Sequence, residues 1–217
     1  MESLKPVIDK LEKLFSKFND RFYGGELQNP VITVSPDSTK GAYGWCTSWK
    51  AWKEAGNEDK DAGYYEINIC AEHLTRTFKE LCGTLLHEMV HLWNLQNGVK
   101  DTSRGGTYHN KKFKEVAEQH GLIIEQHPKY GWTITHLNEE AKQFISGLGD
   151  TGFGIYRDSA ANIKTKKTSS QSSRKYVCPC CGTVVRATKV VRISCICLLY
   201  TSQILWGIQR GFRGCRR

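Results

Sequence analysis

The sequence lacks any apolar run long enough to cross a membrane, and its first residues lack the apolar core of a secretory signal peptide. We therefore expect a cytoplasmic protein with no membrane-spanning segment. Because disulfides are rare in that compartment, the nine cysteines are expected to be metal ligands or buried thiols. With 217 residues, of which 39% are hydrophobic, the chain can form one sizeable domain and a small appendage.

Acidic residues are nearly absent from the last part of the chain. Residues 151–217 contain 13 Lys or Arg and a single acid, Asp158, whereas residues 1–150 contain 18 Lys or Arg and 21 acids. A near-neutral region is thus followed by one with a net charge of +12. Such a basic extension is typical of proteins that bind the phosphates of DNA, although it can also serve solubility alone.

His87, Glu88 and His91 form a His-Glu-x-x-His motif inside an apolar, helical run at residues 81–93. On a helix the two histidines lie one turn apart on one face, so they can bind one metal ion. Zinc suits imidazole ligands and keeps one position for water in catalytic sites. Glu88 points into the same sector and can act as a general base. The motif therefore predicts zinc-assisted peptide hydrolysis, and a structural or vestigial metal site is the alternative.

The hydrophobic pattern predicts a mixed α+β domain around this motif. Residues 2–22 form an amphipathic pattern, and the motif helix is expected over residues 75–97. Three strands that can form a small antiparallel sheet are expected at residues 31–34, 42–52 and 64–71. The remaining predicted segments, in chain order, are a surface loop at 99–108, a helix at 109–120, a hairpin at 122–136 and a closing helix at 138–145.

A catalytic zinc needs a third protein ligand. The metzincin pattern would place a histidine six residues after the second one, but that position is Asn97. Glu115 and Glu118 lie on the next predicted helix, but they point away from its apolar face. His109, at the start of that helix, shares this face. We therefore predict that His109 is the third ligand and that two neighbouring helices supply the three imidazoles.

Other chemically active side chains near the motif are expected to be structural. His120 lies at a helix C-terminus, where the helix dipole favours a charged ring. Cys46 and Cys70 have no metal-ligand spacing and are predicted to be buried thiols. Tyr108 or Tyr130 could stabilise an oxyanion, and the sequence does not choose between them, but core packing is the favoured role for either.

The motif helix, followed by Tyr-His-Asn-Lys-Lys-Phe at residues 108–113 and by Gly121, resembles the SprT-like zinc metallopeptidase family. The N-terminal helix followed by Phe-Tyr-Gly-Gly-Glu-Leu at residues 22–27 is similar too. The resemblance covers about residues 5–146. It implies an α+β, minigluzincin-like domain, a zinc ion held by His87, His91 and His109, and Glu88 as general base. Family members studied as proteases cut proteins in a DNA-dependent way, which implies a protein substrate associated with or crosslinked to DNA.

The C-terminal region resembles the zinc ribbon that often follows a SprT-like domain. Cys178 and Cys181 have the C-x-x-C spacing of a zinc knuckle, and Cys195 follows 13 residues later. The position of a fourth thiolate is occupied by Leu198, so Cys197 is the available substitute. The tail could thus hold a second, structural zinc ion, with Cys178, Cys181, Cys195 and Cys197 as its ligands.

These observations predict four segments. Residues 1–146 form the metallopeptidase domain, and 147–175 a flexible basic linker rich in Gly, Ser, Thr and Lys. Residues 176–197 form the zinc-ribbon-like module, and 198–217 are unassigned, with the composition of an out-of-frame or chimeric end. The predicted function is a zinc metalloendopeptidase brought to DNA by its tail. The alternatives are an inactive zinc-containing DNA-binding protein and a tail that serves only as a folding or docking staple.

Overall fold

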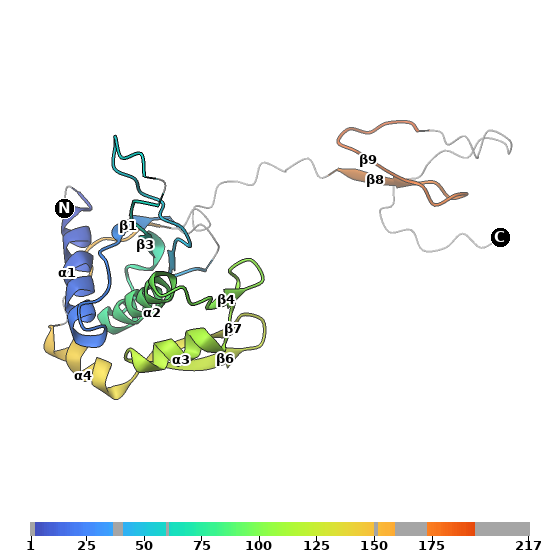
Figure 1. Ribbon diagram of the computed structural model, residues 1–217. Coiled ribbons are helices and arrows are strands. Elements are labelled where there is room, and N and C mark those ends of the chain that lie inside the picture. Colours follow the sequence, from blue (N-terminus) through green and yellow to red (C-terminus); the bar gives the residue numbers. More distant parts are fainter. Residues whose placement is uncertain (1–2, 37–40, 60, 150–151, 159–172, 194–217) are drawn as a thin grey trace. The chain divides into compact units, whose positions relative to one another are not determined.

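The computed structural model describes residues 3–36, 41–59, 61–149, 152–158 and 173–193 (Figure 1). The chain divides into two compact units, Met1–Ser159 and Ala160–Arg217. Cys195, Cys197 and residues 198–217 lie outside the described residues. Within the part that is described, no helix has the length and apolar character that a membrane span requires.

The first unit is a mixed α+β domain. Its four α-helices within the described part are α1 (Lys5–Phe22), α2 (Phe78–Gln96), α3 (Lys111–Gln119) and α4 (Glu139–Gly147). One sheet has the strand order β1-β3-β2, with β1 (Val31–Ser35), β2 (Gly44–Cys46) and β3 (Glu66–Cys70), and a 3-10 turn (Ala71–His73) follows β3. The other sheet has the order β4-β5-β7-β6, with β4 (Thr102–Ser103), β5 (Tyr108–His109), β6 (Leu122–His127) and β7 (Gly131–Leu137).

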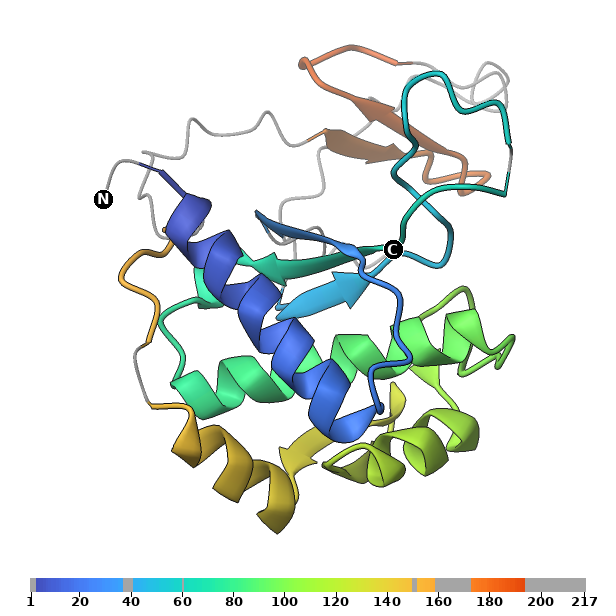
Figure 2. The ribbon, with the colours of Figure 1, turned by 60° about the vertical axis from the view of Figure 1, so that its left-hand side comes forward.

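Helix α2 lies between the first sheet and the layer formed by α3 and the β6–β7 hairpin (Figure 2). It begins at a capping box, in which Thr77 accepts a hydrogen bond from the Glu80 backbone and Glu80 accepts one from the Thr77 backbone. Eleven of its residues are buried, including Leu85, Met89 and Leu92. A helix that is apolar on most of its faces is packed on most of its sides. This packing makes α2 a rigid support for the motif residues.

The first sheet is mixed, so the predicted antiparallel sheet is wrong. Strand β1 pairs with β3 in parallel, with Val31 opposite Glu66, whereas β2 pairs with β3 in antiparallel orientation. Parallel neighbours need a long crossover, and the chain between β1 and β3, which contains β2, supplies it. Strand β2 is thereby left at an edge of the sheet, next to α2.

The segment predicted as a surface loop contains two short strands, so that prediction is wrong in part. Strand β4 pairs with β5, which in turn pairs in parallel with β7. His109 belongs to β5, and α3 begins only after Asn110, whose side chain accepts hydrogen bonds from the backbones of Lys112 and Phe113. The expectation that His109 lies on the helix is therefore incorrect. Strands of two residues are too short to produce a periodic pattern.

His120 is structural but not charged, contrary to the expectation from the helix dipole. Its ring stacks on Tyr23 at 4.2 Å between centroids, its Nδ1–H donates to the Val116 carbonyl at 2.6 Å, and it is only 8% exposed. Burial lowers the pKa of His120, and the bond to Val116 offsets this only in part. Desolvation is thus the largest effect on the pKa of His120.

The stability of the protein should depend on pH through His120. Because its pKa is lower in the folded chain, the unfolded chain binds more protons below pH ~6.5, and stability falls as the pH drops through that value. Replacing His120 by Gln should therefore cost more stability at pH 7.5 than at pH 5.5. Urea denaturation of both proteins at the two pH values measures this difference, and an equal cost at both would contradict the assignment.

Candidate metal centre

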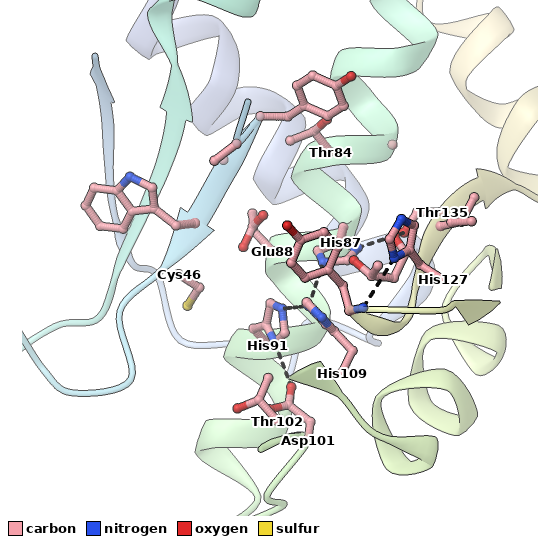
Figure 3. Close-up of a pocket in the computed structure, with 18 of the residues that line it drawn as sticks. Cys46, Thr84, His87, Glu88, His91, Asp101, Thr102, His109, His127 and Thr135 are labelled. Atoms are coloured by element: carbon pink, nitrogen blue, oxygen red, sulfur yellow. Dashed lines mark hydrogen bonds and ion pairs between the residues drawn. The ribbon is translucent and has the colours of Figure 1, made fainter. Parts of the chain in front are cut away.

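Three imidazole rings converge at one point of the domain. His87 and His91 project from α2, and His109 reaches them from β5 (Figure 3). The Nε2 atom of His109 lies 3.3 Å from that of His87 and 3.1 Å from that of His91. Among the described residues this is the one group of three or more potential ligands that could hold a metal ion. The predicted convergence of the three histidines is therefore confirmed.

The spacing of the three nitrogens fits a tetrahedral ion. A zinc–nitrogen bond of 2.0–2.1 Å places two ligand nitrogens of a tetrahedron about 3.3 Å apart. The distances from His109 Nε2 to the other two rings, 3.3 and 3.1 Å, agree with this value. Imidazole donors without thiolates also suit zinc. The residues present therefore fit a zinc ion with three protein ligands.

Hydrogen bonds fix the orientation of the two rings on α2. The Thr135 hydroxyl donates to the Thr133 carbonyl and lies 2.7 Å from His87 Nδ1, so it accepts the Nδ1–H of His87. The Asp101 carboxylate lies 2.6 Å from His91 Nδ1 and accepts a hydrogen bond from its N–H. In both rings the proton is thereby held on Nδ1, and the lone pair of Nε2 points toward the common centre.

Burial favours the neutral form of two of the three rings. It lowers the pKa of His87 well below its usual value and the pKa of His109 to about 4, and the charge of neighbouring rings adds to both effects. For His91, burial is outweighed by the hydrogen bond to Asp101 and by the charges of Glu88 and Asp101, so its pKa is raised. Neutral imidazole is the form that binds metals, so His87 and His109 are ready as ligands at pH 7.

Glu88 lies beside the histidines and is itself almost fully buried, with 5% exposure. Desolvation raises its pKa to about 7. Space for this carboxylate depends on Gly44 in β2, because a Cβ at that position would lie 3.3 Å from Glu88 Oε1 and 2.7 Å from the Asn68 carbonyl oxygen. A carboxyl group with a pKa near neutrality can both accept and return a proton.

The centre lies in an elongated cleft of about 1710 Å³. Its floor follows α2 from the region of Arg76 to Leu95, and β2 forms one wall. The β6–β7 hairpin contributes residues opposite, including Tyr130 and Thr135. The shape suits an extended chain better than a compact small molecule.

The side chains that orient the rings of His87 and His91 could not be predicted from the sequence. Asp101 is 7% exposed and receives hydrogen bonds from His91 and from Asn94, at 3.0 Å. Burial opposes its ionisation, but these bonds and the charge of His91 prevail, so its pKa is lowered. For Asp101, the one feature that could have indicated this role was its position in the polar segment after the motif. Thr135 lies in the middle of a hairpin strand, and nothing in the sequence around it indicated a role in the centre.

The other residues singled out in the sequence fall into two groups. Tyr130 lines the cleft and is exposed, whereas Tyr108 packs beneath the guanidinium of Arg104. Cys70 is a buried thiol, as predicted. Cys46 is half-buried and lines the cleft, and burial, with the charges of Glu88 and Asp101, raises the pKa of its thiol.

The three described cysteines of the second unit, Cys178, Cys180 and Cys181, lie at the turn of a hairpin. Strand β8 (Arg174–Val177) pairs with β9 (Val184–Ala187) in antiparallel orientation. The Cys178 backbone donates to the Thr183 carbonyl and accepts from the Gly182 amide, which closes the turn. Cys178 is buried, whereas Cys181 is exposed and its Sγ lies 3.1 Å from Thr183 Oγ1. The ligand roles of Cys178 and Cys181 remain predictions.

Replacing Asp101 by Asn should weaken zinc binding at the three histidines by about 10–100-fold, because the charged acceptor that orients His91 is lost. Competition with a fluorescent zinc chelator measures the affinity. Asp20→Asn, on the exposed face of α1, is the matched control and should leave the affinity unchanged. Equal affinities for the two variants would show that Asp101 does not support the ligand.

Comparison with known protein families agrees with this geometry. The SprT-like family model matches residues 11–136, more than half of the chain. That segment contains the three histidines, Glu88, Asp101 and Thr135. A search of curated proteins found no match. Because the family model matches more than half of the chain, including the candidate metal centre, the chain belongs to the SprT-like family.

Proposed function

We propose that this protein is a zinc-dependent metalloendopeptidase that hydrolyses peptide bonds of protein substrates. The observation that carries the proposal is that three imidazole nitrogens, two from α2 and one from β5, converge beside the buried carboxylate of Glu88. His87, His91 and His109 would hold the zinc ion, and Glu88 would be the general base. Membership of the SprT-like family supports this assignment.

The chemistry divides between the ion and Glu88. When bound, zinc lowers the pKa of a water molecule and polarises the carbonyl of the scissile bond. Glu88 accepts the proton of the attacking water and then delivers it to the amine that leaves. In the metal-free chain burial raises the pKa of Glu88 to about 7, and the charge of a bound ion would lower it toward the basic form that accepts a proton. Asp101 and Thr135 hold the ligand rings during the reaction.

Strand β2 is suited to hold the substrate in an extended conformation. In the β2–β3 ladder, Tyr43 and Thr47 make backbone hydrogen bonds to β3. Because this pattern alternates along an antiparallel strand, the N–H and C=O groups of Gly44 and Cys46 point away from β3. Both residues line the cleft. An extended polypeptide can therefore pair with this edge and pass over Glu88.

The test is cleavage of an unstructured protein, such as casein, by the zinc-loaded full chain. Cuts mapped by mass spectrometry should lie inside the substrate, should stop when a chelator removes the metal, and should resume when zinc is added back. The proposal fails if the zinc-loaded chain makes no cuts, with or without DNA present. That outcome would favour the alternative, an inactive zinc-containing DNA-binding protein.

We also propose that the substrates are proteins associated with DNA and that the basic tail binds the DNA. The charge of +12 on residues 151–217 supports this role. Binding of the full chain to single- and double-stranded DNA should then weaken steeply as salt rises, as counterion release requires. Affinity that does not change with salt would leave the tail as a folding or docking staple.

A further inference from the structure

Arg76 is held in a fixed position near one end of the cleft. Its guanidinium carbon lies 3.9 Å from the centroid of the Tyr43 ring, and Nη1 donates to Thr84 Oγ1 at 2.9 Å. Nη2 lies 3.8 Å from the Glu80 carboxylate. The side chain is half-buried and lines the cleft. An arginine fixed in this way loses little further conformational freedom when it binds a ligand.

Among the described residues, Arg76 has few hydrogen-bond partners for its donors. A guanidinium carries five N–H donors, and the bond to Thr84 uses one of them. The distance to Glu80 is too long for a hydrogen bond, and that carboxylate already accepts from the backbone and hydroxyl of Thr77. Lys79, which is exposed and also lines the cleft, adds a second positive charge three residues away. Glu80 lines the same end, so these three side chains leave one net positive charge there. With the donors that Arg76 does not use, this end of the described cleft can bind an anion.

The position of Arg76 relative to Glu88 can be derived from Thr84. Thr84 precedes Glu88 by one helical turn, about 6 Å along α2 (Figure 3). Both side chains approach the same point of β2, since a Cβ on Gly44 would lie 3.2 Å from Thr84 Cγ2 and 3.3 Å from Glu88 Oε1. An extended chain advances about 3.3 Å per residue. Thr84 is therefore about two substrate residues from Glu88 along the cleft, and the guanidinium lies 2.9 Å from the Thr84 hydroxyl.

We propose that Arg76 is a specificity-determining residue that binds a carboxylate of the substrate about two residues from the scissile bond. This inference rests on the proposed peptidase function. The planar fork of a guanidinium matches the two oxygens of a carboxylate. The carboxylate belongs either to an Asp or Glu side chain or to the C-terminus of the substrate.

The test uses peptide capture, which does not depend on turnover. The zinc-loaded full chain carrying Glu88→Gln is immobilised and exposed to random decapeptide libraries, one with free and one with amidated C-termini. Retained peptides are identified by mass spectrometry. We expect about tenfold enrichment of peptides with a suitably placed carboxylate, as a charged hydrogen-bonded pair provides. If Asp and Glu are enriched in both libraries, the bound carboxylate belongs to a side chain. If peptides are enriched only from the library with free C-termini, the bound carboxylate is the C-terminus.

Adding Arg76→Gln should abolish this preference, and Arg76→Lys should reduce it, because the charge remains but the fork is lost. Arg21→Gln is the matched control, since Arg21 forms an exposed ion pair on α1. Thermal unfolding and zinc content show whether the Arg76→Gln variant has folded. If it has not, the preference measured for the Arg76→Lys variant tests the proposal. The proposal is wrong if no peptide is retained, if retained peptides show no preference for carboxylates, or if the preference survives without Arg76. If the unaltered chain does not cleave casein, the peptidase function is wrong, but the peptide-capture result can still be interpreted because capture does not require cleavage.

Discussion

Replacing Glu88 by Gln is expected to lower the rate of peptide cleavage by about 10²–10⁴-fold, the contribution of a general base, while zinc remains bound. Gln has nearly the shape of Glu and fits the same space beside Gly44, but its amide cannot accept the proton of the attacking water. The three imidazole ligands are unchanged by this substitution. Steady-state cleavage of a peptide taken from a mapped casein site, together with metal analysis, measures both properties.

Glu115→Gln is the matched control for Glu88→Gln. Glu115 is exposed on α3 and was one of the two glutamates weighed as zinc ligands. Its replacement should change neither cleavage nor zinc content. If Glu88→Gln retained full activity, the proton would have to be accepted by another group, and the mechanism proposed for the centre would be wrong. If it lost its zinc, Glu88 would act as a ligand and not as a base.

The helices and the hairpin could be predicted because each has a pattern of its own. Helix α2 has an apolar stripe and a capping box at Thr77, and the β6–β7 hairpin has two apolar segments around the turn that precedes Gly131. That His109 joins the two motif histidines could be predicted by excluding Asn97 and the glutamates of α3. The helix face that favoured His109 was the wrong reason, because His109 lies in β5. Local sequence was sufficient where the chemistry required particular residue types.

The rest of the centre depends on contacts between distant segments. Asp101 reaches His91 only because β4 pairs with β5, and Thr135 reaches His87 only because β7 lies beside α2. The parallel pairing of β1 with β3 likewise depends on the path of the chain and not on the composition of either strand. Such partners have no characteristic spacing to the motif, so a single sequence cannot reveal them.

Replacing His109 by Ala should remove zinc from the centre, because two imidazoles remain where three converge. The loss in affinity should exceed the 100-fold that removal of an outer partner causes. At free zinc 100-fold above the dissociation constant, the unaltered chain gains about 2.7 kcal/mol of stability from the ion. The variant should gain almost none at the same concentration, which thermal unfolding with and without zinc measures.

Metal analysis of the His109→Ala variant also separates the two predicted zinc sites. If the tail binds an ion through Cys178 and Cys181, the content should fall from two ions per chain to one, and otherwise from one to none. His136→Ala is the matched control, because His136 is exposed, lines the same cleft and lies outside the ligand group, so its loss should not change the content. Unchanged zinc in the His109→Ala variant would mean that the ring in β5 does not bind the ion. Because the peptidase proposal requires three imidazoles, it would then lose the observation on which it rests.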